Sequence, residues 1–384
     1  MSRAVFPTAP PDSMDWNRHT KKQFRAALTN VYRSYTALKR FTAEDFGESL
    51  GAITGEQALS DAAFALIDWA ESRSRLDELF KTFCSENPNH SVAKALSPKS
   101  KGEKQGRSMF SFETVRVDEQ GQVIERIQRR AEYWDVDLGA GVSLTMVRIP
   151  GGLFFMGAPE SEEGRHSSEG PRHRVRVPEF WIGKYPVTQT HWWQVASLPQ
   201  VNQVLALDPS SFKGNDHPVE MVSWEDTQEF CRRLSRLSDF TFGLPSEAQW
   251  EYACRAGTET SFAFGPTLST DVANYRSRTT YGKWLKGQDY EQTTPVSQFP
   301  PNCWGLYDMH GNVLNWCSDS WHEDYKGAPI NGASWMSGEL GERVVRGGSW
   351  RSSESFCRSA YRAFDQCKAR FNAVGFRVVC SSPH

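Results

Sequence analysis

Apolar side chains between residues 20 and 88 recur at the three- to four-residue spacing of amphipathic helices, as Phe24 and Leu28 do. Ser60 is placed to cap one of these helices. Asn87-Pro88 ends the last one, because the residue before a proline disfavours helical geometry. The pattern predicts a small bundle of four or five short helices with a modest core.

The spacing then changes from helical to alternating. Residues 91–108 are polar, basic and poor in large apolar side chains, which predicts a flexible linker. Residues 109–136 alternate apolar with polar positions on both sides of the turn Asp118-Glu119-Gln120-Gly121-Gln122, which predicts a β-hairpin. The first sixteen residues are polar and contain proline, so we expect a loose end there.

From about residue 140 onward, Gly, Pro and Trp are dense and helical spacing is rare. Two exceptions start at Ser223 and at Ser246, where acidic residues fall in the first helical turn and are favoured by the helix dipole. Trp224, Trp250, Trp316 and Trp350 are bulky enough to anchor a core that has little regular structure.

Composition narrows the class of protein. Apolar residues make up 39% and charged residues 23%, as in folded soluble domains. The net charge of −2 argues against a nucleic-acid-binding surface over the whole molecule. No apolar run is long enough to span a bilayer, and we find no secretion signal, so we expect a cytoplasmic protein. The eight cysteines form no CxxC pair, which makes a zinc ribbon unlikely and reduced thiols the expectation.

The chain carries a series of motifs that resembles one known family. These are MVRIPGGLFFM at 146–156, FWIGKYPVT at 180–188, HPVEMVSWEDTQEFCRRLS at 217–235, LPSEAQWEYACRAG at 244–257, TTPVSQFPPNCWGLYDMHGNV at 293–313, RVVRGGSW at 343–350 and GFRVV at 375–379. In this order they resemble the formylglycine-generating enzyme, or sulfatase-modifying factor, family. The resemblance implies an α+β protein with a C-type-lectin-like domain, but fold does not establish activity.

The resemblance also implies where catalysis would occur. Formylglycine-generating enzymes use two cysteines just after the RGGS segment, as a metal-bound thiolate pair that activates oxygen. These positions are Ser352 and Cys357 here, and one thiol cannot form a two-thiolate copper site. The family's Trp-Glu after Gly-Asn-Val is Leu314-Asn315. We therefore expect no copper and no sulfatase activation, and we assign no hydrolase triad.

The family often holds structural Ca²⁺ with side-chain and carbonyl oxygens. The matching positions here are Asp308, the carbonyls of Gly311 and Val313, and Asn315, where Asn replaces a glutamate and removes a charge. A second set would use Asn274, the carbonyls of Tyr275 and Tyr290, and Gln288 or Asp289. The alternative is that these groups only form loop hydrogen bonds.

Residues 351–374 resemble the variable region of proteins diversified by retroelements, which use the same lectin-like fold. Their template is copied with errors at adenines, often in Asn codons, which excludes Lys, Gln, Glu, Met and Trp. Glu354, Gln366 and Lys368 are therefore expected to be fixed, like the frame Cys357–Ala360, Arg362, Arg370 and Gly375–Arg377. The eleven positions that satisfy the restriction form the predicted binding surface: Arg351, Ser352, Ser353, Phe356, Tyr361, Ala363, Phe364, Asp365, Phe371, Asn372 and Ala373. Aromatic side chains among small residues suit ligand binding, unless the aromatics face the core.

Residues 24–89 resemble the bacterial effector-associated domain, a death-domain-like helical adaptor. The resemblance implies docking onto an effector or signalling protein. The alternative is a bundle that only packs on its own lectin-like domain.

These features together predict a helical adaptor over 17–90, a linker over 91–108, a hairpin extension over 109–140 and a lectin-like domain over 141–381. The predicted function is a non-catalytic bacterial receptor that binds an unknown ligand, expected to be a protein, through the surface within 343–380. Two alternatives are an oxidase with altered chemistry and an undiversified scaffold of a bacterial conflict system. A neighbouring reverse transcriptase gene with a near-repeat of these codons would separate the receptor from the scaffold.

Overall fold

The structure is a computed structural model that describes residues 18–55, 57–87, 90, 92, 107–238, 240–277, 287–338 and 341–381. The chain divides into two compact units, Met1–Lys104 and Gln105–His384. The loose end expected before residue 17 and most of the expected linker lie outside the described residues. Each unit is described by itself.

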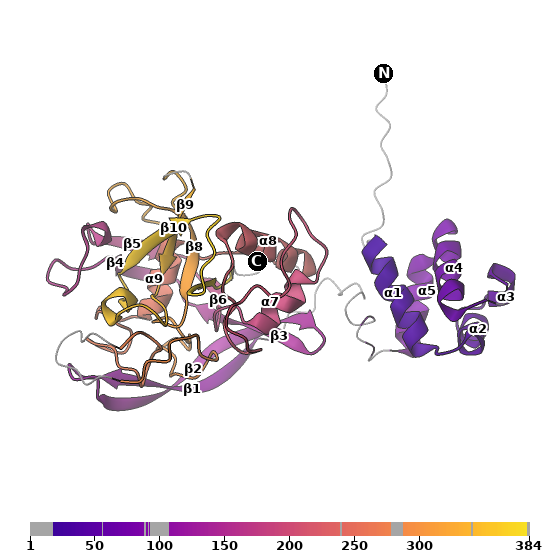
Figure 1. The fold of residues 1–384 in the computed structure, drawn as a ribbon, viewed down its shortest axis with the longest axis horizontal. Helices are drawn as coiled ribbons and strands as arrows, with labels where there is room; N and C mark the ends of the chain where they lie inside the picture. Colours follow the sequence, from indigo (N-terminus) through magenta and orange to yellow (C-terminus); the bar gives the residue numbers. More distant parts are fainter. Residues whose placement is uncertain are drawn as a thin grey trace, which may run out of the picture. The chain divides into compact units, whose positions relative to one another are not determined.

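The first unit is a bundle of five helices in the described residues: α1 (Arg18–Val31), α2 (Tyr35–Glu44), α3 (Leu50–Ile53), α4 (Leu59–Ser72) and α5 (Leu76–Glu86) (Figure 1). Its core is rich in aromatic rings, and the Phe24 ring lies 5.0 Å from that of Phe80 and 5.3 Å from that of Phe83, edge to face. Helix α5 ends before Asn87-Pro88, as predicted. The prediction that Ser60 caps a helix is wrong, because α4 begins at Leu59 and its N-cap position is Ala58.

The second unit begins with the predicted hairpin, made of β1 (Ser108–Val117) and β2 (Val123–Gly139). Strand β2 is long enough to pair with β1 over its first half and with β3 (Val142–Ile149) over its second half. The sheet continues through β6 (Phe180–Gly183), β12 (Val379–Ser381) and β7 (Phe242–Gly243), in the order β1-β2-β3-β6-β12-β7. The last strand of the chain thus completes the sheet that the first strand begins.

Two smaller sheets complete this unit. One has the order β10-β9-β8-β11, from β8 (Leu314–Ser320), β9 (Glu342–Arg346), β10 (Arg362–Gln366) and β11 (Val374–Phe376). The other pairs β4 (Gly152–Met156) with β5 (His173–Val177), and the loop between them holds the 3₁₀ helix η1 (Ser167–Glu169). A second 3₁₀ helix, η2 (Glu354–Cys357), lies in the predicted variable segment.

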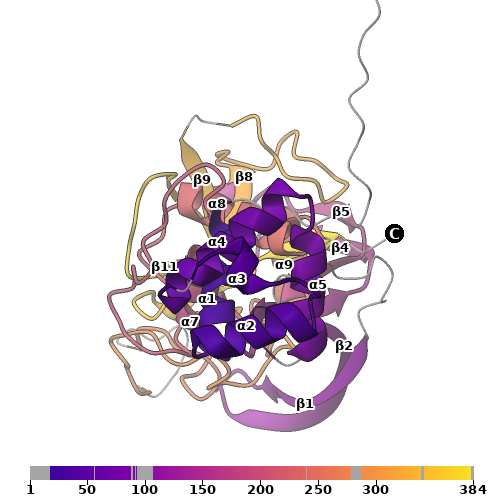
Figure 2. The same ribbon diagram turned by 90° about the vertical axis from the view of Figure 1, so that its right-hand side faces the viewer.

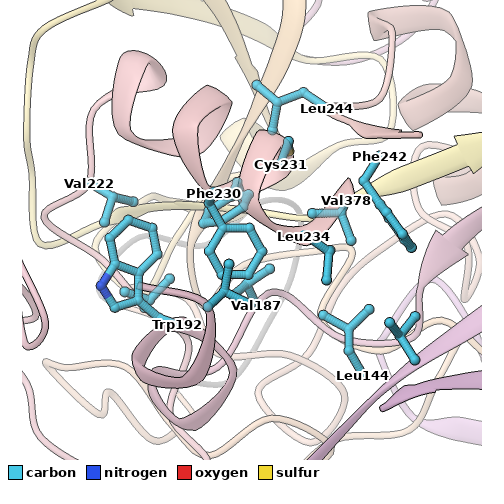
Figure 3. Close-up of a cluster of buried hydrophobic side chains, with 14 of the residues drawn as sticks. Leu144, Val187, Trp192, Val222, Phe230, Cys231, Leu234, Phe242, Leu244 and Val378 are labelled. Atoms are coloured by element: carbon cyan, nitrogen blue, oxygen red, sulfur yellow. The ribbon is translucent and has the colours of Figure 1, made fainter. Parts of the chain in front are cut away.

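Three helices pack around these sheets: α7 (Gln189–Ala196), α8 (Trp224–Leu237) and α9 (Glu247–Arg255). Helices α8 and α9 begin where the sequence predicts, because Ser223 and Ser246 each form a capping box with the residue three positions on. Helices α7 and α8 bring apolar side chains together over the large sheet (Figure 3). The Trp192 and Phe230 rings stack there at 5.5 Å.

These observations confirm the predicted α+β class, with a helical bundle in one unit and mixed sheets and helices in the other. Trp250 and Trp316 are fully buried, whereas Trp224 and Trp350 are half-buried. All eight cysteines are free. Within the described ranges, the structure contains no helix that is both long enough and apolar enough to cross a membrane.

Candidate ligand-binding surface

The predicted variable segment follows β9 and runs through η2, β10 and β11. Strand β10 pairs with β9, and β11 pairs in parallel with β8, so both ends of the segment belong to the four-stranded sheet. The part between them is held by side chains of the frame predicted from the sequence. Arg358, Arg362 and Arg377 of that frame are buried.

Arg358 ties the segment to the loop between β4 and β5. Its guanidinium forms two ion pairs with Glu169, Nη1 to Oε2 at 2.8 Å and Nη2 to Oε1 at 2.6 Å. Nη1 also donates to Glu162 at 2.6 Å, and Nη2 donates to the Gly164 carbonyl at 2.7 Å. The side chains of Arg358 and Glu169 are both fully buried. Bidentate geometry and complete hydrogen bonding are what make such a buried pair tolerable.

A second buried network lies beneath β9 and β10. Glu247, at the start of α9, accepts from Arg346 at 2.6 Å and from Arg362 at 2.7 and 2.8 Å. Arg346 also donates to Glu251 at 2.6 Å. Burial alone would raise the pKa of Glu247, but the guanidinium groups of Arg362 and Arg346 outweigh it and lower that pKa. The carboxylate therefore stays charged, and the network fixes the backbone of both strands.

Backbone geometry also fixes the start of the segment. Gly348 has φ +70°, and a Cβ at that position would collide with the Cys357 sulfur, so only glycine fits. Trp350 Nε1 donates to the Asn372 carbonyl at 3.0 Å, which joins the two ends of the segment.

The structure places ten of the eleven predicted positions at least partly on the surface. Phe356 is 40% exposed, and Phe364 and Phe371 are each 44% exposed. Arg351 is exposed, and the half-buried positions are Ser352, Ser353, Tyr361, Ala363, Asp365 and Asn372. Ala373 differs, because it is only 3% exposed directly before β11 and cannot contribute to a surface. Of the positions expected to be fixed, Glu354 is buried, whereas Gln366, Lys368 and Arg370 are exposed.

Residues outside the segment extend this surface. The Phe356 ring lies 4.9 Å from that of Tyr361, and His166 of the β4–β5 loop lies 5.7 Å from Tyr361. Phe364 lies 4.7 Å from Trp321, which also contacts the Arg362 guanidinium. Sequence reasoning missed His166 and Trp321, because they come from distant loops and no local pattern marks them.

Alternation along β10 separates the predicted positions. Phe364 points toward Trp321, whereas Ala363, one residue earlier, packs against the main core. Further on, the segment lies against the start of α8, where the Glu225 N–H donates to the Cys367 carbonyl and Arg370 pairs with Asp226 at 2.8 Å. Phe371 therefore belongs to the part of the surface near α8.

The positions that correspond to the catalytic cysteines hold one hydroxyl group and one buried thiol. Ser352 Oγ accepts from the Ser349 N–H at 3.0 Å. The Cys357 thiol is fully buried, and burial raises its pKa well above that of a free thiol. A buried, protonated thiol is a poor nucleophile and metal ligand. His310 lies 3.7 Å from Cys254, but it donates from Nδ1 to the Cys357 carbonyl and accepts from the Ala263 N–H, so both ring nitrogens are engaged.

The first predicted calcium set does not fit a cation. Asn315 Oδ1 accepts from Arg377 Nε at 2.9 Å and from Trp250 Nε1 at 3.2 Å. Asn315 Nδ2 donates to the Val313 carbonyl at 2.8 Å. The Asn312 side chain donates to Asp308 at 3.2 Å. The Arg377 guanidinium thus occupies the side of Asn315 where a cation would have to lie.

The second predicted set fits better. Asn274 Oδ1 is buried and has no hydrogen-bond partner among the residues that the structure describes, which leaves an oxygen of the kind that Ca²⁺ prefers. Asn274 Nδ2 donates to the Gln292 carbonyl at 2.9 Å, which fixes the orientation of the amide. Among the described residues, no three His, Cys, Asp or Glu side chains gather into a metal site, so such a site would also need amide and carbonyl oxygens.

Comparisons with known proteins define the family to which this fold belongs. The description "Sulfatase-modifying factor enzyme 1-like domain" matches residues 141–382, and the chain belongs to this family. Residues 14–100 match effector-associated domain 1. The formylglycine-generating enzyme of Mus musculus is 29% identical over 292 residues, with 62% of this chain and 75% of that protein covered. The enzyme of Thermomonospora curvata is 28% identical, with 60% and 92% covered.

Solved structures agree with this family. PvdO from Pseudomonas aeruginosa is 31% identical with a TM-score of 0.56, and the match covers 65% of this chain and 98% of that one. Treponema denticola variable protein 1 is 24% identical with a TM-score of 0.53, and the match covers 65% and 99%. The fold is therefore shared with a protein named as variable as well as with enzymes.

Proposed function

We propose that this chain is a non-catalytic receptor. Its lectin-like unit binds a ligand, expected to be a protein, through a surface diversified by a retroelement. The helical unit recruits an effector or signalling partner, as the effector-associated domain implies. The eight free thiols suit a reducing compartment, and we propose that both units act in the bacterial cytoplasm.

The observation that carries this proposal is that residues 351–377 combine buried side chains that hold the backbone with exposed side chains that are free to vary. Buried arginines, with Arg358 paired to Glu169 and Arg362 to Glu247, hold the backbone. Phe356 and Phe364 project from that backbone and are substantially exposed. A surface that must accept many side chains needs this separation, because exposed substitutions change stability little.

The two positions that correspond to the catalytic cysteines support a role without catalysis. Ser352 supplies no second thiol, and Cys357 is buried. We expect no formylglycine in a sulfatase-motif peptide that is incubated with the protein and copper. Mass spectrometry of the peptide tests this, with Cys357→Ala as the background control. Product formed faster by the wild type than by that variant would favour the oxidase alternative.

For calcium, we propose the Asn274 set in preference to the Asp308 set. Its oxygen ligands would come from Asn274, the carbonyls of Tyr275 and Tyr290, and Gln288 or Asp289. The support is the unpartnered Asn274 Oδ1. Ca²⁺ bound there would link loops that are distant in sequence and would stabilise the native state by mass action.

Deep sequencing of codons 343–380 in cultures grown from single cells tests the diversification. We expect substitutions confined to the predicted positions, with the codons of Arg358, Arg362 and Arg377 unchanged, and a near-repeat of these codons beside a reverse transcriptase gene. A uniform sequence with no such repeat in the genome would leave the undiversified scaffold as the better description.

A further inference from the structure

Helices α1 and α4 of the helical unit, labelled in Figures 1 and 2, contact each other. Residues of both helices line a groove. Its floor and rim contain Phe64 and Ile67, and the polar residues that line it are Lys21, Lys22, Arg25, Asp68 and Glu71. Phe64 is 56% exposed, more than any other large apolar side chain among the described residues of this unit. A single exposed phenylalanine is common on soluble proteins, so only its surroundings can mark Phe64 as part of a docking site.

The two walls of the groove carry opposite charges. Helix α1 has the sequence RHTKKQFRAALTNV, with 4 Lys and Arg residues and no acidic residue. Helix α4 has the sequence LSDAAFALIDWAES, with 3 acidic residues and no Lys or Arg. The separation of charge therefore follows the helices themselves, and one side of the groove is basic while the other is acidic.

Part of this charge is satisfied within the bundle and part is not. Lys21 forms an ion pair with Glu71 across the groove. Arg25 lies over the Phe64 ring, 5.6 Å from its centre. Lys22 and Asp68 are both exposed, and within the described part of the chain neither has an ion-pair partner. The groove thus presents an apolar centre between one free cation and one free carboxylate.

We propose that a second copy of the same helical unit docks in this groove and forms a two-fold dimer. In a two-fold interface, if one residue contacts a second on the partner, the second also contacts the first. Lys22 of each copy would then face Asp68 of the other, giving two attractive contacts, with the Phe64 side chains buried between them. The inference does not depend on the ligand that the lectin-like unit binds.

The mixed charge of the groove favours a second copy over other occupants. A uniformly acidic segment would be repelled by Asp68 and Glu71, and a uniformly basic one by Lys22 and Arg25. A copy of this domain carries both charges at the matching places. Burial of two Phe64 side chains would supply the apolar contribution that exposed ion pairs lack.

A charge-swap experiment on the full-length chain tests the pairing. The variants are Lys22→Glu, Asp68→Lys, the double variant that carries both changes, and Phe64→Ser. Analytical ultracentrifugation gives the dimer dissociation constant of each, and circular dichroism checks that each variant is folded. All three positions are exposed, so the variants should fold. Arg40→Glu, an exposed change on α2 away from the groove, is the matched control.

We expect a wild-type dimer that each single charge variant weakens by about ten- to a hundredfold, because two attractive contacts become repulsive. An equimolar mixture of Lys22→Glu and Asp68→Lys chains should dimerise again, and so should the double variant. Phe64→Ser should weaken the dimer in every background, and Arg40→Glu should not. A monomeric wild type, single variants that remain dimeric, or a mixture that stays monomeric would each overturn the proposal.

Discussion

Arg358 and Glu169 are 189 positions apart in the sequence, yet their side chains form a bidentate ion pair with no exposure to solvent. The pair joins the middle of the predicted variable segment to the loop between β4 and β5. The diversification model keeps Arg358 fixed. The ion pair can therefore hold the backbone of the segment while the neighbouring side chains change.

Replacing Arg358 by alanine should destabilise the lectin-like unit by about 3–5 kcal/mol, because Glu169 would remain as a buried and unpaired carboxylate. The neighbouring exposed residue provides a control, since Arg351→Ala should change the free energy of unfolding by less than about 0.5 kcal/mol. Urea denaturation measures both. Equal effects of the two substitutions would mean that the ion pair does not hold the segment.

His310 should make stability depend on pH. Burial lowers its pKa to about 4 in the folded protein, from the usual value near 6.5. Below pH 6.5 the unfolded chain therefore binds a proton that the folded chain does not, and stability falls as the pH falls from 6.5 towards 4. The full effect is about 3 kcal/mol.

The matched variant is His310→Gln, which keeps a donor and an acceptor but does not titrate. Urea denaturation between pH 7 and pH 4 gives the difference between the wild type and this variant at each pH. We expect the wild type to lose about 3 kcal/mol of unfolding free energy relative to His310→Gln as the pH falls from 7 to 4. A difference that is independent of pH would show that His310 is not held neutral.

Calcium should raise the melting temperature through Asn274. The test compares melting in CaCl₂ with melting in chelator, for the wild type, Asn274→Ala and Asp308→Asn. At a concentration about a hundred times the dissociation constant, binding adds about 2.7 kcal/mol. We expect the calcium-dependent shift to disappear in Asn274→Ala and to persist in Asp308→Asn. A shift that persists in Asn274→Ala but disappears in Asp308→Asn would instead place the calcium site at the Asp308 set. If calcium does not shift the melting temperature of the wild type, neither set binds calcium.

Much of the fold was predictable because its signals are local. Ser223 and Ser246 mark helix starts through capping boxes that involve neighbouring residues. The alternation in 109–136 marks the hairpin in the same way. The error at Ser60 has a local cause too, since a serine can cap a helix but this helix starts two residues earlier, with Ala58 at the N-cap position.

The surface was less predictable because its neighbours come from elsewhere in the chain. The codon restriction selects positions by residue type alone, so it included Ala373, which the pairing of β11 with β8 buries. The codon restriction was applied only within residues 351–374. It therefore could not identify Trp321 or His166, which contact Phe364 and Tyr361 from other loops. Nor could the sequence show that Arg377 hydrogen-bonds to Asn315, a residue of the Asp308 calcium set, from a segment 62 positions away.

Side chains on the predicted binding surface should be exchangeable, whereas those of the frame should not. Two matched libraries of displayed protein test this difference, one that randomises the exposed positions Arg351, Phe356, Phe364 and Phe371 and one that randomises Arg358, Ala360, Arg362 and Phe376. The measurement is the fraction of each library that resists protease at a concentration that digests unfolded chains. Exposed changes cost less than about 0.5 kcal/mol and buried aromatic losses about 3–5 kcal/mol, so most of the first library should stay folded and most of the second should not. Equal loss of folded members from both libraries would contradict the account.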